Sequence, residues 1–206
     1  MKKIHVSLKE YENIFFSSDQ HFGHRNVLRF CNRPFENTKE MEIALIKKWN
    51  ETVTNKDVVF TLGDFCWFND SRQIKKILNQ LNGKKIYIIL GNHDTLESFH
   101  RVDDPRIEII EDIAHVYVHE PDQPDREIIL CHYPLMTWAH RDKGAINLFG
   151  HIHSGPGCQN TFDQDLPLYA GQQYDVGCDN NNYTPISLEE VDEKLRMGDI
   201  FARIGM

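Results

Sequence analysis

The chain has 206 residues, and its 31 acidic and 23 basic residues give a formal net charge of −8. A compact fold of this length removes roughly 70% of the unfolded chain's surface from water, and no repeat or linker divides the sequence, so we expect a single domain over residues 1–206. The acidic balance disfavours an extended nucleic-acid track. No apolar run approaches the ~20 residues of a membrane span, and the sequence shows no signal peptide. It therefore predicts a cytoplasmic protein with no membrane partner.

The first half of the chain alternates short apolar runs with helix patterns. Residues 14–16 are β-branched or aromatic and stop at a Ser-Ser-Asp cluster, which predicts a buried strand that ends in a loop. A helix is predicted over about 38–52, and a second strand over 58–60. Apolar residues at helical spacing then predict a helix with Ser71 as its cap and Gly83 as its stop.

The second half is richer in sheet. Residues 86–90 predict a strand that ends at Gly-Asn-His-Asp. A hairpin-connected sheet is predicted from three apolar runs, 107–110, 113–118 and 128–130, with a turn over 121–125 before the last of them. A further strand is expected over 146–149, followed by an irregular region over about 154–173. The capping-box sequence 187–190 predicts a short C-terminal helix.

Five of these predicted strands end in Asp, Asn or His, and their apolar runs lack a period of two. Such runs are typical of strands that are covered on both faces. We therefore predict an α/β fold, a two-sheet β-sandwich flanked by helices, with the candidate active site at the carboxyl ends of the strands.

The five cysteines are odd in number and form no Cys-x-x-Cys pair. This pattern signals neither a disulfide framework nor a thiolate zinc site. We expect reduced and mostly buried thiols.

Histidine and carboxylate side chains recur at the strand ends in a pattern that indicates a metal site. Asp19 and His21 stand two residues apart, so an extended backbone aims both the same way, and His151 and His153 repeat the spacing. The other strand ends carry Asp64, Asn92, His93 and His132. Imidazole mixed with carboxylate suits Zn, Fe, Mn or Ni better than Ca or Mg. One carboxylate shared by two ions would hold them about 3.5–4 Å apart, the spacing used in phosphoryl displacement.

The order Asp-x-His, Gly-Asp, Gly-Asn-His-Asp, His, Gly-His-x-His resembles the calcineurin-like metallophosphoesterase superfamily, over about three quarters of the chain from Asp19 to His153. Within it, segments 18–24, 31–35 and 175–177 resemble a small bacterial and phage group of stand-alone phosphoesterases. Serine/threonine protein phosphatases of the superfamily carry Gly-Asp-x-x-Asp-Arg-Gly, and the second Asp and the Arg are missing after Asp64. That departure disfavours a phosphoprotein substrate.

The resemblance implies a two-sheet sandwich flanked by helices and a centre of two divalent metal ions, with Mn the metal expected in vitro. It assigns Asp19, His21 and His153 to the first metal. It assigns Asn92, His132 and His151 to the second metal, with Asp64 bridging the two. A metal-bridging hydroxide would attack phosphorus in line, and His93 would act as the general acid. The implied activity is a phosphodiesterase or phosphatase that acts on a small phosphoester or a nucleotide.

Other residues near these motifs are weaker candidates. His24 and Arg25 are candidate phosphate contacts. Aromatic residues after the shared carboxylate fit core packing better than stacking on a base, and these are Phe65, Trp67 and Phe68. A rim of the site and an ordinary polar loop both fit Trp138, His140 and Arg141. Turn capping explains Asp175 and Asp179, and no function is assigned to His5, His100, His115 or His119.

Two alternatives remain open beside the small-molecule phosphoesterase. The first is a nuclease, against which the net charge of −8 argues. The second is a non-catalytic scaffold with the same fold, which has no chemical need to retain all seven ligands. The sequence leaves the physiological substrate, the native metal and the oligomeric state open.

Overall fold

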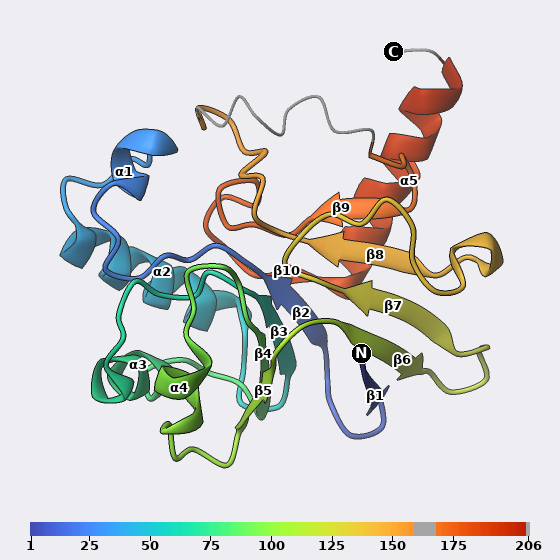
Figure 1. The fold of residues 1–206 in the computed structure, drawn as a ribbon. Helices are drawn as coiled ribbons and strands as arrows, with labels where there is room; N and C mark the ends of the chain where they lie inside the picture. Colours follow the sequence, from blue (N-terminus) through green and yellow to red (C-terminus); the bar gives the residue numbers. More distant parts are fainter. Residues whose placement is uncertain (159–167, 205–206) are drawn as a thin grey trace.

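The computed structural model describes residues 1–158 and 168–204, and it shows an α/β fold built from two five-stranded mixed sheets with helices beside them (Figure 1). The predicted irregular region over about 154–173 falls partly on residues 159–167, which lie outside this description. In the part of the chain that is described, no helix is both long enough and apolar enough to cross a membrane.

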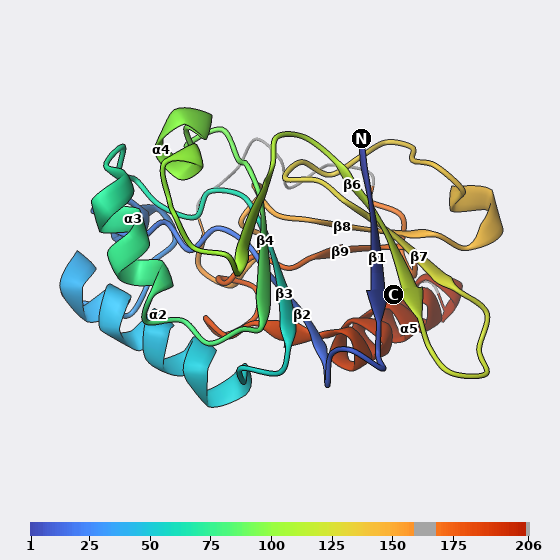
Figure 2. The same cartoon turned by 90° about the horizontal axis from the view of Figure 1, so that it is seen from below.

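The first sheet is the one that carries helices on its outer face (Figure 2). Its strand order is β10 (Ile186–Ser187), β2 (Ile14–Ser17), β3 (Val58–Leu62), β4 (Lys85–Ile89) and β5 (Ile107–Ile110). β2 to β5 run parallel and β10 is antiparallel to β2. The covering helices are α1 (Val27–Phe30), α2 (Thr38–Thr52), α3 (Ser71–Leu78) and α4 (Leu96–His100). One apolar cluster, which includes Met41, Trp49 and Phe65, fills the space between them and the sheet.

The second sheet has the order β1 (Lys2–Ser7), β6 (Ala114–His119), β7 (Arg126–Leu130), β8 (Ile146–Phe149) and β9 (Gln173–Asp175). Only the β6–β7 pair is antiparallel. On its outer face lies the segment that contains the short 3-10 helix η1 (Arg141–Lys143), packed through Trp138. This sheet therefore relies on a loop where the first sheet relies on helices.

The two sheets pack face to face around the largest apolar cluster. Alternate residues of both sheets contribute to it, among them Phe16 and Phe60 from the first sheet and Val116 and Leu148 from the second. The C-terminal helix α5 (Leu188–Ile204) adds Leu188, Val191 and Leu195 to the same cluster. Strands that are buried on both faces explain the absence of a polar/apolar alternation in their sequences.

Most predicted elements appear in the structure with sharper ends. α2 spans Thr38–Thr52 and begins after Asn37, whose side chain accepts hydrogen bonds from two backbone amides. The cap of α3 is Asp70 and not Ser71. α3 ends at Leu78, and a three-residue turn then brings Leu81 into the core, which is why helical spacing seemed to continue.

Two predictions about sheet and helix extent are wrong. The run 107–110 forms no hairpin with the next strand, because β5 pairs parallel with β4 in the first sheet while β6 starts the second. An apolar run predicts a strand but does not indicate which sheet the strand joins. The C-terminal helix is also 17 residues long rather than short, although its capping box forms as predicted, with Ser187 and Glu190 bonded reciprocally.

Candidate metal centre

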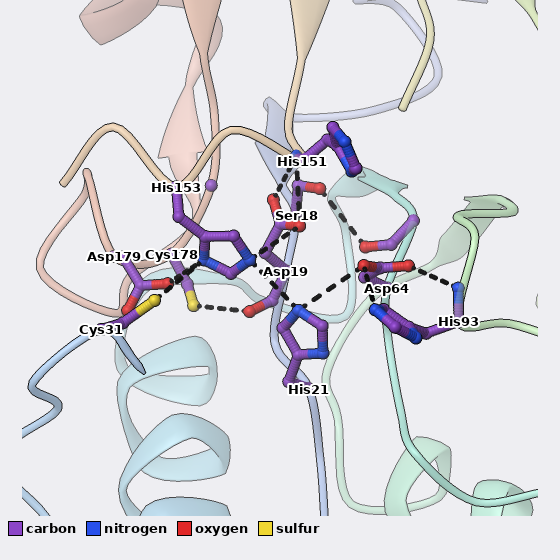
Figure 3. A network of polar contacts seen from close by, with 12 residues as sticks. Ser18, Asp19, His21, Cys31, Asp64, His93, His151, His153, Cys178 and Asp179 are labelled. Carbon is purple, nitrogen blue, oxygen red and sulfur yellow. Dashed lines mark hydrogen bonds and ion pairs between the residues drawn. The ribbon is translucent and has the colours of Figure 1, made fainter. Parts of the chain in front are cut away.

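Loops from both sheets meet at one end of the sandwich and bring the predicted ligands together (Figure 3). The first sheet supplies the loops after β2, β3 and β4, and the second supplies those after β7 and β8. In parallel strands the carboxyl ends share one edge, so the loops that follow them are neighbours. Each loop carries one or two of the candidate residues, which are Asp19, His21, Asp64, Asn92, His93, His132, His151 and His153.

Asp19, His21 and His153 form the first group, and their ligand atoms all lie within 4.8 Å of one another. The Nε2 atoms of His21 and His153 are 3.2 Å apart, and Nε2 of His153 is 3.7 Å from Oδ1 of Asp19. Two imidazole nitrogens at that separation either share a proton or face a common cation. The backbone amide of His151 donates to both oxygens of Asp19, which keeps the carboxylate aimed at this group.

Asp64, His132 and His151 form the second group, again with ligand atoms within 4.8 Å. The amide oxygen of Asn92 lies 3.1 Å from Nε2 of His132 and extends this group. Oδ2 of Asp64 is 3.6 Å from Nε2 of His132 and also 3.6 Å from Nε2 of His21. Asp64 therefore stands equally near an imidazole of each group.

Five of the seven predicted ligands adopt left-handed backbone conformations. Their φ angles are 58° at Asp19, 52° at His21, 51° at Asp64, 70° at His151 and 45° at His153. Asp and His tolerate this region better than most residues, but it still costs free energy of order 1 kcal/mol each. Such strain concentrates at functional sites, where the surrounding structure enforces it.

Glycines before the ligands let the loops approach each other closely. A Cβ atom on Gly91 would lie 2.2 Å from Oδ1 of Asp64 and 2.4 Å from its backbone nitrogen. A Cβ on Gly150 would lie 2.3 Å from Oδ2 of Asp19. The Gly-Asn-His and Gly-His-x-His motifs thus need glycine because the carboxylate of another loop occupies the place of its side chain.

The charges of the buried site residues are tuned by one another. Burial raises the pKa of the Asp19 carboxyl, and the neighbouring His153 opposes that shift. Burial acts the same way on Asp64, but the imidazoles of His132 and His21 outweigh it and lower the pKa of Asp64. Burial lowers the pKa of His21 well below its usual range. An ionised Asp64 and a neutral His21 are the forms that bind a metal.

His132 and His153 are each held by a hydrogen bond on the nitrogen that faces away from the cluster. Nδ1 of His132 lies 2.7 Å from the carbonyl oxygen of Leu62, and Nδ1 of His153 lies 2.7 Å from Oδ2 of Asp179. This bond makes Nδ1 the protonated nitrogen and leaves Nε2 free as a ligand atom. Burial works against protonation of His132, but Asp64 and Asp19 raise its pKa to about 8. Metal binding near neutral pH would therefore displace a proton from His132.

Asp179 has a larger part than the turn capping expected for it. Besides His153, it accepts two hydrogen bonds of 2.7 Å from the buried guanidinium of Arg33. Burial alone would raise its pKa, but His153 and Arg33 lower it to about 2. Sequence reasoning missed this link because 146 residues separate Arg33 from Asp179. Asp175 does cap a turn, since it accepts a hydrogen bond from the amide of Gly177.

A pocket of about 600 Å³ opens onto the two groups. His93 lines it, and Nε2 of His93 is 3.9 Å from Oδ2 of Asp64. His24 also lines the pocket and stacks on Trp67 with 3.9 Å between ring centroids. Core packing is confirmed for Phe65 but wrong for Trp67, a residue that is 48% exposed and lines the pocket. Arg25 is exposed and does not line the pocket.

Other candidates lie away from this pocket. Trp138 is buried under the second sheet, and Arg141 covers its ring, so the reading as an ordinary loop segment fits better than a rim of the site. Four of the remaining histidines lie on the outer face of the second sheet in two groups. His115 and His140 both contact Glu127, while His119 contacts Asp125 and His5. Phe68 is partly buried beneath the loop of Gly23.

The cysteines behave as predicted in that all five are free thiols and four are buried. The structure adds that Cys31 and Cys158 approach His153 and Asp179, with all four ligand atoms within 4.8 Å. No sequence signal could show this, because Cys31 and Cys158 come from loops that are distant in the chain.

The donor set fits two divalent ions. Imidazole nitrogens and carboxylate oxygens converge in two groups that share a carboxylate, and burial with left-handed backbone holds them in place. Mixed nitrogen and oxygen ligands of this kind suit borderline metals such as Mn, Fe and Zn. The residues that could hold them are those named in the two groups, with Asn92 added to the second.

The fold and site thus define an α/β protein of two packed mixed sheets, with a buried cluster of imidazole and carboxylate groups at the strand ends. No family model matches the chain. The uncharacterized protein MJ1445 of Methanocaldococcus jannaschii is 31% identical over 194 residues, which cover 93% of this chain and 96% of that protein. The chain therefore belongs to the same protein family as MJ1445.

The chain is also similar to a phage protein and to a solved structure. The Gene 66 protein of Mycobacterium phage D29 is 29% identical over 163 residues, which span 69% of this chain and 79% of the phage protein. The crystal structure of the protein of unknown function AQ665 from Aquifex aeolicus superposes with a TM-score of 0.62 at 24% identity, covering 88% of this chain and 98% of AQ665. This last likeness shows a shared fold.

Proposed function

We propose that the protein is a binuclear metal-dependent phosphoesterase of the calcineurin-like metallophosphoesterase type, which hydrolyses a phosphodiester or phosphomonoester. The observation that carries the proposal is the position of Asp64, whose Oδ2 lies 3.6 Å from an imidazole nitrogen of each ligand group. A carboxylate placed in this way can serve two ions at once, and two adjacent ions are the arrangement used for phosphoryl displacement.

The chain's residues divide the work between them. Asp19, His21 and His153 would hold one ion, and Asn92, His132 and His151 the other, with Asp64 shared. Bound divalent cations supply Lewis-acid chemistry there, activating water and neutralising the phosphoryl oxygens. Asp179 and the carbonyl of Leu62 keep the imidazoles of His153 and His132 in the tautomer that binds.

His93 is the proton donor in this proposal. Its backbone amide donates to Oδ1 of Asp64, so its loop is tied to the shared carboxylate. Its ring lines the pocket and is more exposed than the ligand imidazoles, which lets it reach the leaving oxygen of a bound ester. Its ring packs against Trp67 at 4.7 Å between centroids and against His21 at 5.5 Å, and these contacts orient it.

The experiment that tests the proposal compares p-nitrophenyl phosphate with bis-p-nitrophenyl phosphate in added Mn²⁺. Asp64→Asn is the test variant, and Asp122→Asn is the matched control because Asp122 is an exposed aspartate in the same left-handed conformation, at φ 59°. We expect hydrolysis by the wild type and by Asp122→Asn. We expect a loss of at least 10³-fold in Asp64→Asn, since the shared ligand loses its charge.

The outcomes separate the alternatives. Faster hydrolysis of the diester identifies a phosphodiesterase, and faster hydrolysis of the monoester a phosphatase. A folded protein that turns over neither substrate with Mn²⁺, Fe²⁺, Zn²⁺ or Ni²⁺ contradicts the proposal and favours the non-catalytic scaffold. Equal activity in Asp64→Asn and Asp122→Asn contradicts the role of the shared carboxylate.

A further inference from the structure

The wall of the pocket that faces the metal centre is built from aromatic side chains that are open to solvent. Three aromatic residues are exposed among those whose side chains are described, residues 1–158 and 168–198, and they are Phe30, Trp67 and Tyr133. Phe30 and Trp67 line the pocket, at 47% and 48% exposure. Tyr133 packs on His151 at 4.5 Å between ring centroids. Tyr133 is outside the pocket lining, so two of the three exposed aromatic residues line this cavity, and exposed apolar surface at a cavity is typical of a binding site.

Trp67 is held rigidly in this wall. One face of its ring stacks on the buried His24, with 3.9 Å between centroids and an angle of 8° between planes. Its backbone amide donates to the carbonyl oxygen of Phe22, and Phe22 forms a β-bridge with Cys66. A ring that is covered on one side and still half exposed presents its other side to the pocket.

One side chain, that of His93, lies between Trp67 in this wall and the position proposed for the phosphate. His93 separates the two, since its ring centroid is 4.7 Å from that of Trp67 and its Nε2 is 3.9 Å from Oδ2 of Asp64. A planar group attached to the phosphate through a sugar would span this gap. The cavity of about 600 Å³ falls within the 300–1,000 Å³ typical of small-ligand pockets.

The other lining residues limit what the phosphate end can be. No lysine or arginine is among the described residues that line the pocket, so a second phosphate held inside it would find no cationic side chain; Arg29, whose guanidinium carbon lies 5.4 Å from the ring centroid of Phe30, is outside that lining. The pocket lining includes one side-chain amide that is not a candidate metal ligand, that of Asn26. This side chain makes no capping hydrogen bond to α1. It can therefore offer a donor and an acceptor to a sugar or base.

We infer that the pocket binds a mononucleotide-type phosphoester, with its base stacked on the Trp67 and Phe30 wall and its single phosphate at the metal centre. This inference rests on the proposed function for the phosphate position. Base stacking on an aromatic side chain tolerates any base, because every base has a π face. Phe30, at the end of α1, would add a second apolar contact to the base or its sugar.

Equilibrium binding tests the inference independently of turnover. Isothermal titration of the Mn²⁺-loaded protein measures Kd for adenosine 5′-monophosphate, ribose 5-phosphate and methyl phosphate, each used as its non-hydrolysable phosphonate analogue so that no turnover occurs. The ratio of Kd for ribose 5-phosphate to that for adenosine 5′-monophosphate isolates the base. We expect a ratio of at least ten in the wild type, because stacking on an aromatic side chain accounts for roughly five- to hundredfold in affinity.

The variants locate that preference. Trp67→Ala should lower the ratio about tenfold, whereas Trp67→Phe retains a ring and should restore most of it. Phe30→Ala should lower the ratio severalfold. Ile43→Ala is the matched control, because Ile43 is an exposed apolar residue on α2 that does not line the pocket.

Two results overturn the inference. One is a wild-type ratio below two, and the other is a ratio unchanged in both Trp67→Ala and Phe30→Ala. If either occurs while diester hydrolysis still depends on Asp64, the base site is wrong and the proposed function stands. If adenosine 5′-monophosphate binds through Trp67 but no ester is hydrolysed, the base site stands and the proposed function fails.

Discussion

Gly91→Ala tests whether the contact between loops, and not the ligands alone, builds the site. The new Cβ would lie 2.2 Å from Oδ1 of Asp64 and 2.4 Å from its backbone nitrogen, while ordinary contacts begin at 3.4 Å. Asp64 or the Gly91 loop must therefore move by about 1 Å, which is 3.4 Å less 2.4 Å. A side chain alone cannot relieve the contact, because one of the atoms belongs to the backbone.

This displacement has two expected consequences. Misplacement of a reacting group by about 1 Å can cost 10²-fold in rate, so we expect kcat/KM for bis-p-nitrophenyl phosphate to fall at least that far. Overpacking of a well-packed region costs about 1–3 kcal/mol, so the free energy of unfolding in urea should fall by that amount. Metal content after gel filtration should drop below two ions per chain.

The control is Gly198→Ala in α5, where the nearest heavy atom to the new Cβ is the backbone nitrogen of Gly171 at 3.5 Å. Alanine has the higher helix propensity, so this variant should gain about 0.5–1 kcal/mol in stability and keep its activity. A Gly91→Ala protein with wild-type kcat/KM and two bound ions would refute the reasoning, since the loops would then tolerate a separation that the structure does not show.

Three further predictions concern the acid, the metals and the buried ion pair. His93→Ala should lower kcat/KM by 10²-fold or more for alkyl esters and by less than tenfold for p-nitrophenyl esters, because only alkoxides need protonation as they leave; equal losses in the two assays would exclude the role. Removal of metal with EDTA should lower Tm by about 10–20 °C, since each of the two ions at 100 times its Kd stabilises the folded state by about 2.7 kcal/mol, and an unchanged Tm in calorimetry would argue against bound metal. The depressed pKa of Asp179, about 2 against an ordinary value of 3.8, corresponds to roughly 2 kcal/mol of stability, which is fully present above about pH 5 and is lost as the pH falls toward 2. Urea unfolding of the metal-free protein should therefore show that the wild type loses about 1 kcal/mol more than Asp179→Asn between pH 6 and pH 3, and parallel losses would contradict this.

The sequence locates the candidate residues better than it predicts the topology. The ligand candidates can be recognised from the local sequence, because each follows an apolar run. Four of them also form two pairs with a spacing of two residues, Asp19 with His21 and His151 with His153. Loops at the carboxyl ends of neighbouring parallel strands lie close together, and β2, β3 and β4 are neighbours in one sheet while β7 and β8 are neighbours in the other. Their roles as ligands remain predictions that the proposed experiments test.

What the sequence does not show is decided by contacts between distant segments. Nothing near Asp179 reveals that Arg33 would neutralise it, and nothing near Trp67 reveals that His24 would cover only one of its faces. The apolar pattern of residues 107–110 predicts a strand but does not say which strand it pairs with. Its pairing with β4 depends on how the whole chain packs. Pairing partners depend on the whole chain, whereas the apolar pattern reports burial alone.

The division of the ligands between the two sheets has a consequence for how the molecule assembles. Asp19 and His21 reach the first group from one sheet and His153 from the other, while the second group takes Asp64 from one and His132 and His151 from the other. Neither sheet alone holds a complete set. A nascent chain with one sheet formed would thus lack a complete ligand group, and the proposed ions would bind at full strength only after both sheets have packed together.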